Sequence, residues 1–166
     1  MTDNRSWAIQ WPTSSRAAIK ASDMALKPHV SIMFNGQCEA AFRFYERCLN
    51  GTISFMLTWG DSPAAEQAPP DWAGKIYHAT LALGDFVMTG GDLPSDRYAR
   101  PTGFSIVLGV DDPSTAERIF DALAQDGQIG MPLQETFWAG RYGAVVDQFG
   151  IAWEVNCERP TEPKPQ

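Results

Sequence analysis

Residues 110–127, VDDPSTAERIFDALAQDG, decide the fold of this chain, because they contain a complete helix with its beginning and its end. Asp112 is a favourable N-cap, Pro113 suits the first helical position, and Gly127 suits the position just past the end. One apolar stripe at helical spacing is formed by Ala116, Ile119, Phe120 and Leu123. The segment therefore predicts an amphipathic helix packed on a core.

The same organisation occurs earlier in the chain, in residues 34–51, FNGQCEAAFRFYERCLNG. The offset of 76 residues between the two segments also places Phe44 on Phe120 and Ile53 on Ile129. Three strand-like runs follow each helical segment: residues 52–59, 75–83 and 85–89, and then 129–136, 141–146 and 151–157. The sequence therefore predicts two modules, each with the order strand, helix, strand, strand, strand.

The predicted organisation is one α+β domain over residues 27–158, with modules at about 28–92 and 101–158. The length of 166 residues suits one domain, and 44% apolar with 20% charged residues favours a packed core. Residues 1–26 show no sustained period and are predicted to be a flexible extension. Residues 159–166, which include three prolines, are predicted to be a frayed tail.

Composition also excludes some classes of partner. A net charge of −7 argues against nucleic acid, which requires clustered Lys and Arg. No apolar run approaches the roughly 20 residues of a membrane helix, and the start has no pattern of a secretory signal. The three cysteines match no zinc-binding spacing, so we expect a cytoplasmic protein.

Alternation along the predicted strands assigns their residues to two faces of the sheet. In the first and last strands, Ile32, Phe34, Trp153 and Val155 are predicted to face the helices. The opposite face is predicted to be polar and to carry His29, Ser31, His78, Thr80, Ser105, Glu154 and Asn156. Both histidines of the protein fall on this face, and convergent polar groups of this kind are typical of a ligand site.

Four stretches resemble PhnB-like proteins: FNGQCEAAFRFY (34–45), TWGDSP (58–63), VDDP (110–113) and MPLQETFWA (131–139). PhnB-like proteins belong to the vicinal oxygen chelate superfamily of glyoxalases, bleomycin resistance proteins and extradiol dioxygenases. The resemblance covers about residues 27–158. It implies two βαβββ modules that form a cup-shaped mixed sheet with helices on the outer face, a small-molecule ligand, and commonly a homodimer.

The resemblance also implies positions for metal ligands. The metal enzymes of the superfamily use one position in the first and last strand of each module, which here are His29, Met88, Ser105 and Glu154. Only His29 and Glu154 suit a divalent ion such as zinc, iron, nickel or manganese. His78 could complete a site with two histidines and one carboxylate, or it could simply bond to a strand neighbour.

The remaining candidate residues leave two interpretations open. Glu154 is either a general base or a carboxylate paired with Arg141 or Arg100. Phe137 and Trp138 either stack on a flat ligand or pack in the core or at a dimer interface. Arg141 either holds an anionic ligand or pairs with a carboxylate.

Two functions follow as hypotheses. The first is an enzyme of the superfamily, a lyase, isomerase or dioxygenase, assisted by metal at His29, His78 and Glu154. The second is a metal-free protein that sequesters a flat ligand in a cup lined by Met88, Ser105, Phe137, Trp138 and Arg141. The chain has no Gly-rich strand-to-helix turn that would bind an adenosyl cofactor, so we do not expect a methyltransferase.

Overall fold

The computed structural model describes residues 27–159 and consists of two modules with the same order of elements. The first module contains β1 (Val30–Phe34), α1 (Cys38–Cys48), β2 (Thr52–Thr58), β3 (Ile76–Leu83) and β4 (Phe86–Asp92), with the short 3₁₀ helix η1 (Ala65–Gln67) between β2 and β3. The second contains β5 (Ile106–Val110), α2 (Pro113–Ala124), β6 (Gln128–Gln134), β7 (Ala139–Val146) and β8 (Ala152–Glu158). The predicted pair of βαβββ modules is confirmed, while the predictions for residues 1–26 and 160–166 lie outside the described residues.

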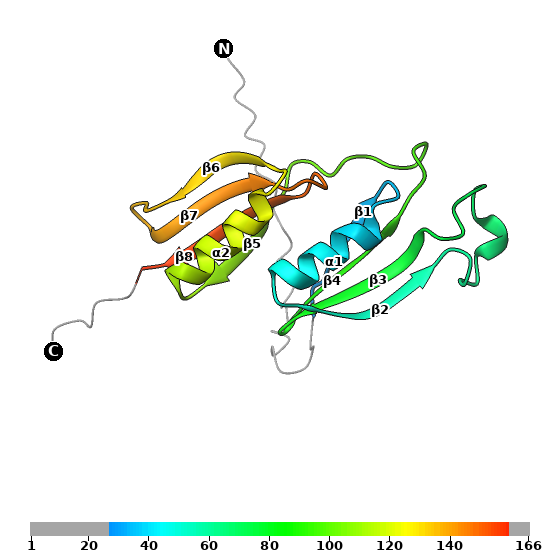
Figure 1. The fold of residues 1–166 in the computed structure, drawn as a ribbon, viewed down its shortest axis with the longest axis horizontal. Helices are drawn as coiled ribbons and strands as arrows, with labels where there is room; N and C mark the ends of the chain where they lie inside the picture. The colour runs from blue at the N-terminus through cyan, green and yellow to red at the C-terminus, as the bar shows by residue number, and fades with distance from the viewer. Residues whose placement is uncertain (1–26, 160–166) are drawn as a thin grey trace, which may run out of the picture.

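Each module forms its own four-stranded mixed sheet. The strand orders are β1-β4-β3-β2 and β5-β8-β7-β6, and the pairs β1–β4 and β5–β8 are parallel. Both helices lie on the same side of the molecule, each across its own sheet (Figure 1). The α+β class is therefore confirmed, but the two sheets do not close into one cup. The strands β1 and β5 are edge strands, which leaves one row of backbone N–H and C=O groups on each without a strand partner.

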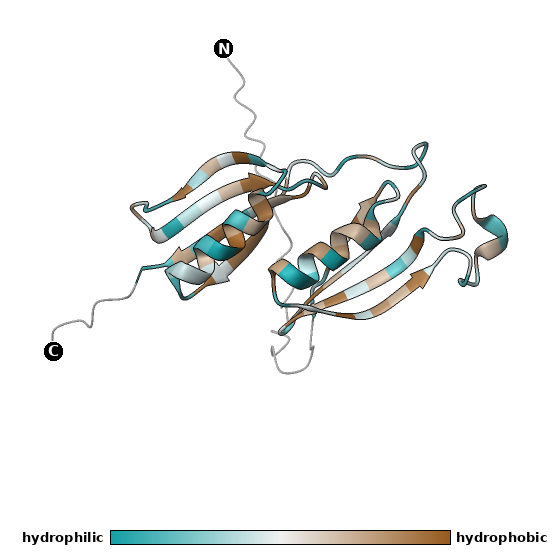
Figure 2. Ribbon diagram, viewed as in Figure 1, coloured by the Kyte–Doolittle hydropathy of each residue, from teal (hydrophilic) through white to brown (hydrophobic). Residues whose placement is uncertain are grey.

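The helix α2 forms as its sequence predicts. The Asp112 carboxylate accepts a hydrogen bond from the backbone N–H of Thr115 at 2.8 Å, and Pro113 occupies the first turn. The hydroxyl of Ser114 also donates to Asp112, and these hydrogen bonds lower the pKa of the carboxyl group. The predicted apolar stripe is buried, and both helices combine hydrophobic and hydrophilic residues around their circumference (Figure 2).

The end of α2 differs from the prediction. Asp126, not Gly127, adopts the left-handed conformation, with φ of 54°. Gly127 is required for another reason: a Cβ atom there would lie 2.6 Å from the carbonyl oxygen of Val146. In the first module Asn50 has φ of 56°, so the two modules turn out of their helices in the same way.

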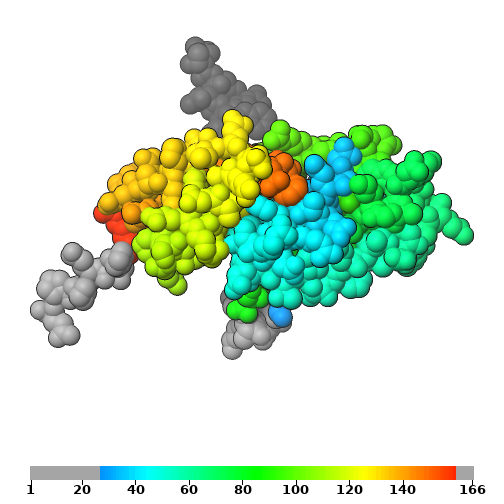
Figure 3. All heavy atoms as spheres, in the orientation of Figure 1, coloured from blue at the N-terminus to red at the C-terminus, as the bar shows by residue number. Residues whose placement is uncertain are grey.

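The two modules share one hydrophobic core and meet on its helix side. The hydroxyl of Tyr45, on α1, donates to Oδ2 of Asp147 at 2.6 Å, and the ring of Phe44 contacts that of Phe149 edge-on. The guanidinium of Arg118, on α2, donates to the carbonyl oxygen of Cys48 at 3.0 Å. In Figure 3 the orange atoms near the β7–β8 turn lie against the blue and cyan atoms of the first module.

Two further findings concern the expected compartment. All three cysteines are free and buried. Within residues 27–159, none of the helices combines the length and the apolar character that a membrane crossing requires.

Candidate functional site

Glu154 lies at the centre of the polar face of the β5–β8 sheet. Its neighbours in β8, Trp153 and Val155, are fully buried, so alternation turns the Glu154 side chain to the other face, as predicted. The hydroxyl of Ser105 donates to Glu154 Oε1 at 2.5 Å, and the hydroxyl of Tyr142 donates to Oε2 at 2.9 Å. Both carboxylate oxygens are thus held in place by side chains from neighbouring segments.

Strand register brings these three residues together. Glu154 pairs with Val107 in β5 and with Ala144 in β7. Ser105 and Tyr142 each lie two residues before these partners, so they share the face of Glu154 and reach it diagonally. The arrangement therefore depends on β8 lying between β5 and β7.

Tyr142 also connects the carboxylate to two exposed aromatic rings. The centroids of the Tyr142 and Trp138 rings are 5.4 Å apart in an edge-to-face pair, and those of Trp138 and Phe137 are 4.5 Å apart. The hydrogen bond to Glu154, and then burial, raise the pKa of Tyr142. Sequence reasoning missed Tyr142, although alternation with the buried Gly143 and Val145 could have placed it on this face.

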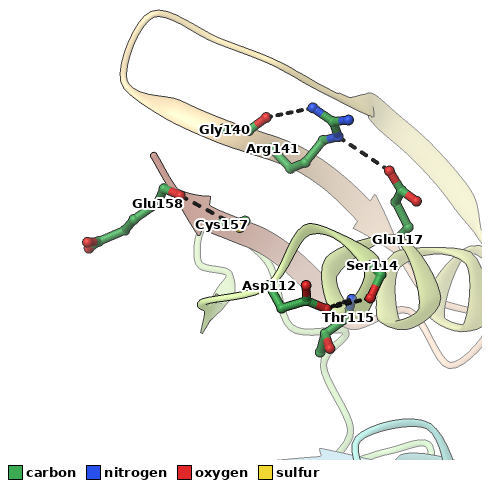
Figure 4. Close-up of polar contacts among 8 residues, drawn as sticks. All are labelled: Asp112, Ser114, Thr115, Glu117, Gly140, Arg141, Cys157 and Glu158. Carbon is green, nitrogen blue, oxygen red and sulfur yellow. Dashed lines mark hydrogen bonds and ion pairs between the residues drawn. The ribbon is translucent and has the colours of Figure 1, made fainter. Parts of the chain in front are cut away.

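Arg141 does not belong to the face of Glu154, and its role as a ligand-binding residue stays a prediction. It pairs across the strands with the buried Cys157 and points to α2. Its Nε lies 3.4 Å from Oε1 of Glu117, and its Nη1 donates to the carbonyl oxygen of Gly140 at 2.9 Å (Figure 4). Glu154 therefore has hydroxyl partners in place of the arginine that the sequence left open.

Met88 lies on the core side of its sheet, and its role as a ligand-binding residue stays a prediction. It is fully buried in the core. Val30 pairs with Met88 in the first module as Ile106 pairs with Trp153 in the second, so Met88 is the counterpart of Trp153, and Thr89 is the counterpart of Glu154. The turns before β4 and β8 differ in length, because β3 and β4 are joined by only two residues, whereas residues 147–151 join β7 and β8.

The two histidines do not meet. His29 is exposed and precedes β1, where the register extrapolates to Val87 and Ala82. Ala82 is level with His29, and His78 lies four residues from Ala82 along β3, a displacement of about 13 Å. His78 is also two strands away from β1, which adds a sideways displacement of roughly 10 Å. Its Nε2 is 3.2 Å from the hydroxyl of Thr80, the bond to a strand neighbour that the sequence left as the alternative.

The residues of one chain therefore do not fit the predicted metal site. Glu154 lies in the second sheet and both histidines belong to the first, and these sheets are separate. Among residues 27–159 no three His, Cys, Asp or Glu side chains are grouped closely enough to hold a metal ion. A single chain brings Ser105 to Glu154 but brings neither His29 nor His78 to it.

An apolar groove of about 510 Å³ adjoins the site between the edge strands β1 and β5. Ser105 lines this groove and also bonds to Glu154. Phe104 precedes β5, is 45% exposed and lines the groove as well. The other lining residues are Val30, Leu83, Phe86, Ile106, Val107, Leu108 and Gly109. The site therefore has an apolar surface on one side and the aromatic rings on the other.

Comparison with known proteins identifies relatives of this chain. Residues 27–155 match the family model of the glyoxalase, bleomycin resistance protein and dioxygenase superfamily. Protein YjdN of Escherichia coli (strain K12) is 36% identical over 152 residues, which cover 84% of this chain and 100% of YjdN. The crystal structure of protein PA1353 from Pseudomonas aeruginosa is 43% identical, with a TM-score of 0.74, and covers 82% of this chain and 100% of that one. The PhnB protein from Bacillus cereus shares the fold, with a TM-score of 0.69 at 23% identity over 80% of this chain and 99% of that one.

A metal is present in a more distant structural neighbour. The fosfomycin resistance protein FosX from Listeria monocytogenes has been solved in complex with Mn(II) and 1S,2S-dihydroxypropylphosphonic acid. It is 10% identical, covers 82% of this chain and 94% of that one, and has a TM-score of 0.57. Members of the superfamily thus bind divalent metal, but the likeness to FosX concerns the fold alone.

Proposed function

Because this chain belongs to the glyoxalase, bleomycin resistance protein and dioxygenase superfamily, we propose that it binds a small molecule on the polar face of its β5–β8 sheet, without a metal ion. The observation that carries the proposal is the continuous set of contacts from Ser105 through Glu154 and Tyr142 to Trp138. It supplies a fixed acceptor beside an exposed aromatic surface, which suits a flat ligand with a hydrogen-bond donor.

We also propose that a second copy of the chain completes the cup. The edges of β1 and β5 have no strand partner, and the groove between them is open and apolar. Exposed hydrophobic side chains next to an open sheet edge favour association with another chain. Sedimentation of the purified protein tests this proposal, which a monomer at all concentrations would contradict.

The metal-assisted enzyme remains the alternative function. It would require His29 of one chain to approach Glu154 of another, because one chain keeps them in separate sheets. Protein purified from cells grown with trace metals decides between the two. About one bound zinc, iron, nickel or manganese ion per chain, lost in both His29→Ala and Glu154→Ala, would contradict metal-free binding.

The binding proposal is tested by NMR with a library of small heteroaromatic compounds. The chain has six tryptophans, and the Trp138→Ala variant assigns the indole N–H signal of Trp138. We expect binders to shift this signal and to lose affinity in Tyr142→Phe. Glu117→Gln, on α2 behind the sheet, serves as a control that keeps the affinity. Binders that leave the Trp138 signal unchanged would place the site elsewhere.

A further inference from the structure

We propose that the ligand of this site carries a positive charge beside a flat ring, with the charge at Glu154 and the ring against Trp138. The inference rests on the proposed function and adds the chemical class of the ligand. It follows from three observations: the open lone pairs of Glu154, the distribution of charge in the sheet, and the exposed aromatic surface.

Glu154 has capacity for another donor. A carboxylate offers about four lone-pair directions. Ser105 donates to one oxygen and Tyr142 donates to the other, which leaves roughly two directions for a ligand. Both partners are neutral hydroxyl groups, so the negative charge of Glu154 is oriented by them but is not neutralised.

The sheet around Glu154 contains a single basic residue. The strands β5, β6, β7 and β8 include one Lys or Arg, Arg141, and it points to Glu117 on the helix side. Glu158 follows Glu154 at an even spacing in β8, so alternation places it on the same face. Arg159, just past β8, is paired with Glu135 at 2.9 Å. The described side chains therefore give this face a negative potential, which favours a cation and opposes an anion.

The aromatic residues next to Glu154 suit the same class of ligand. Trp138 is 50% exposed and Phe137 is 88% exposed. A cation within about 6 Å of an indole or phenol ring is attracted to its face, and tryptophan provides the strongest attraction. Because the Tyr142 ring touches Trp138 and its hydroxyl touches Glu154, a small ligand can contact a ring and the carboxylate together.

The test compares two probes of the same size, the cation 1-methylquinolinium and the neutral 6-methylquinoline, by NMR titration of the full chain near neutral pH. We expect the cation to bind about tenfold more tightly, a difference equal to about 1.4 kcal/mol. In Glu154→Gln this preference should vanish while 6-methylquinoline keeps its affinity. In Glu117→Gln, which removes a charge on the helix side of the sheet, the preference for the cation should persist. Added salt should lower the affinity of the cationic probe and leave that of the neutral probe unchanged.

The outcomes separate this inference from the proposed function. Equal affinity for both probes, with binding lost in Trp138→Ala, would overturn the preference for a cation and leave the site in place. Tighter binding of the anion quinoline-2-carboxylate would overturn it too. Binding of neither probe at Trp138 would count against both the preference and the proposed site.

Discussion

Asp147 offers a demanding test of how the two modules are held together. Its carboxylate is 4% exposed and accepts four hydrogen bonds. Oδ1 accepts from the backbone N–H groups of Phe149 and Ile151 at 2.8 and 3.0 Å. Oδ2 accepts from the Tyr45 hydroxyl at 2.6 Å and from the Trp153 indole N–H at 2.8 Å. The exchange Asp147→Asn changes the chemistry of this group at nearly constant volume.

The cost of the exchange follows from the donors that the amide must face. If its oxygen keeps the two backbone bonds, its NH₂ group points at Tyr45 and Trp153. The Tyr45 hydroxyl can rotate and accept, but the indole N–H can only donate, so the fully buried Trp153 loses its partner. An unsatisfied buried donor costs about 1–3 kcal/mol, and the loss of hydrogen bonds to a charged acceptor adds to it, so we expect about 2–4 kcal/mol of destabilisation.

Urea unfolding at neutral pH measures this cost, with Tyr45→Phe as the matched comparison. Tyr45→Phe removes one donor and leaves three bonds on Asp147, so it should cost about 1–2 kcal/mol. The order of the two variants is the essential result. If Asp147→Asn were as stable as the native chain within roughly 0.5 kcal/mol, the described network would not hold the modules together.

Three further predictions follow from the structure. Burial, above all, raises the pKa of Cys48 to about 11, so between about pH 8.5 and 11 the folded chain keeps a thiol proton that the unfolded chain releases. The free energy of unfolding should therefore fall as the pH rises through this range, and it should fall less steeply in Cys48→Ala. An equal dependence of stability on pH in both proteins would refute this. Gly127→Ala places a Cβ atom 2.6 Å from the backbone oxygen of Val146 and should lower the stability measured by thermal unfolding by about 1–3 kcal/mol. Gly74→Ala, which adds a Cβ atom in open space, should lower stability far less. Equal losses of stability in the two variants would exclude the steric explanation. Arg141→Ala removes a partly exposed ion pair worth about 0–1 kcal/mol and should leave probe affinity unchanged, so a large loss of binding would return Arg141 to the site.

The elements and their faces could be predicted from the sequence because they depend on neighbours in the chain. The cap at Asp112 involves groups three residues apart, and the stripe of α2 repeats every three to four residues. Alternation within one strand was enough to turn Glu154 away from the core. These patterns required no knowledge of which strands pair.

Strand pairing decided the composition of the site, and no local pattern contains it. The donors to Glu154 are 49 and 12 residues away in sequence, so they meet only after β5, β8 and β7 align. Because the turns differ in length, the residue that corresponds to Glu154 in the first module is Thr89 and not Met88, and a shift of one residue moves a side chain to the other face of a strand. The same rule sent Arg141 to α2 and Tyr142 to Glu154.

The sequence by itself thus determined two βαβββ modules, the buried faces of their helices and the outward position of Glu154, since each depends on short-range periodicity. Only the tertiary structure decided that the sheets remain separate, that His29, His78 and Glu154 do not gather into one group, and that neutral hydroxyls hold this carboxylate. The physical reason is that register and sheet order come from contacts between residues distant in the chain, and a displacement of one residue reverses the face on which a side chain acts.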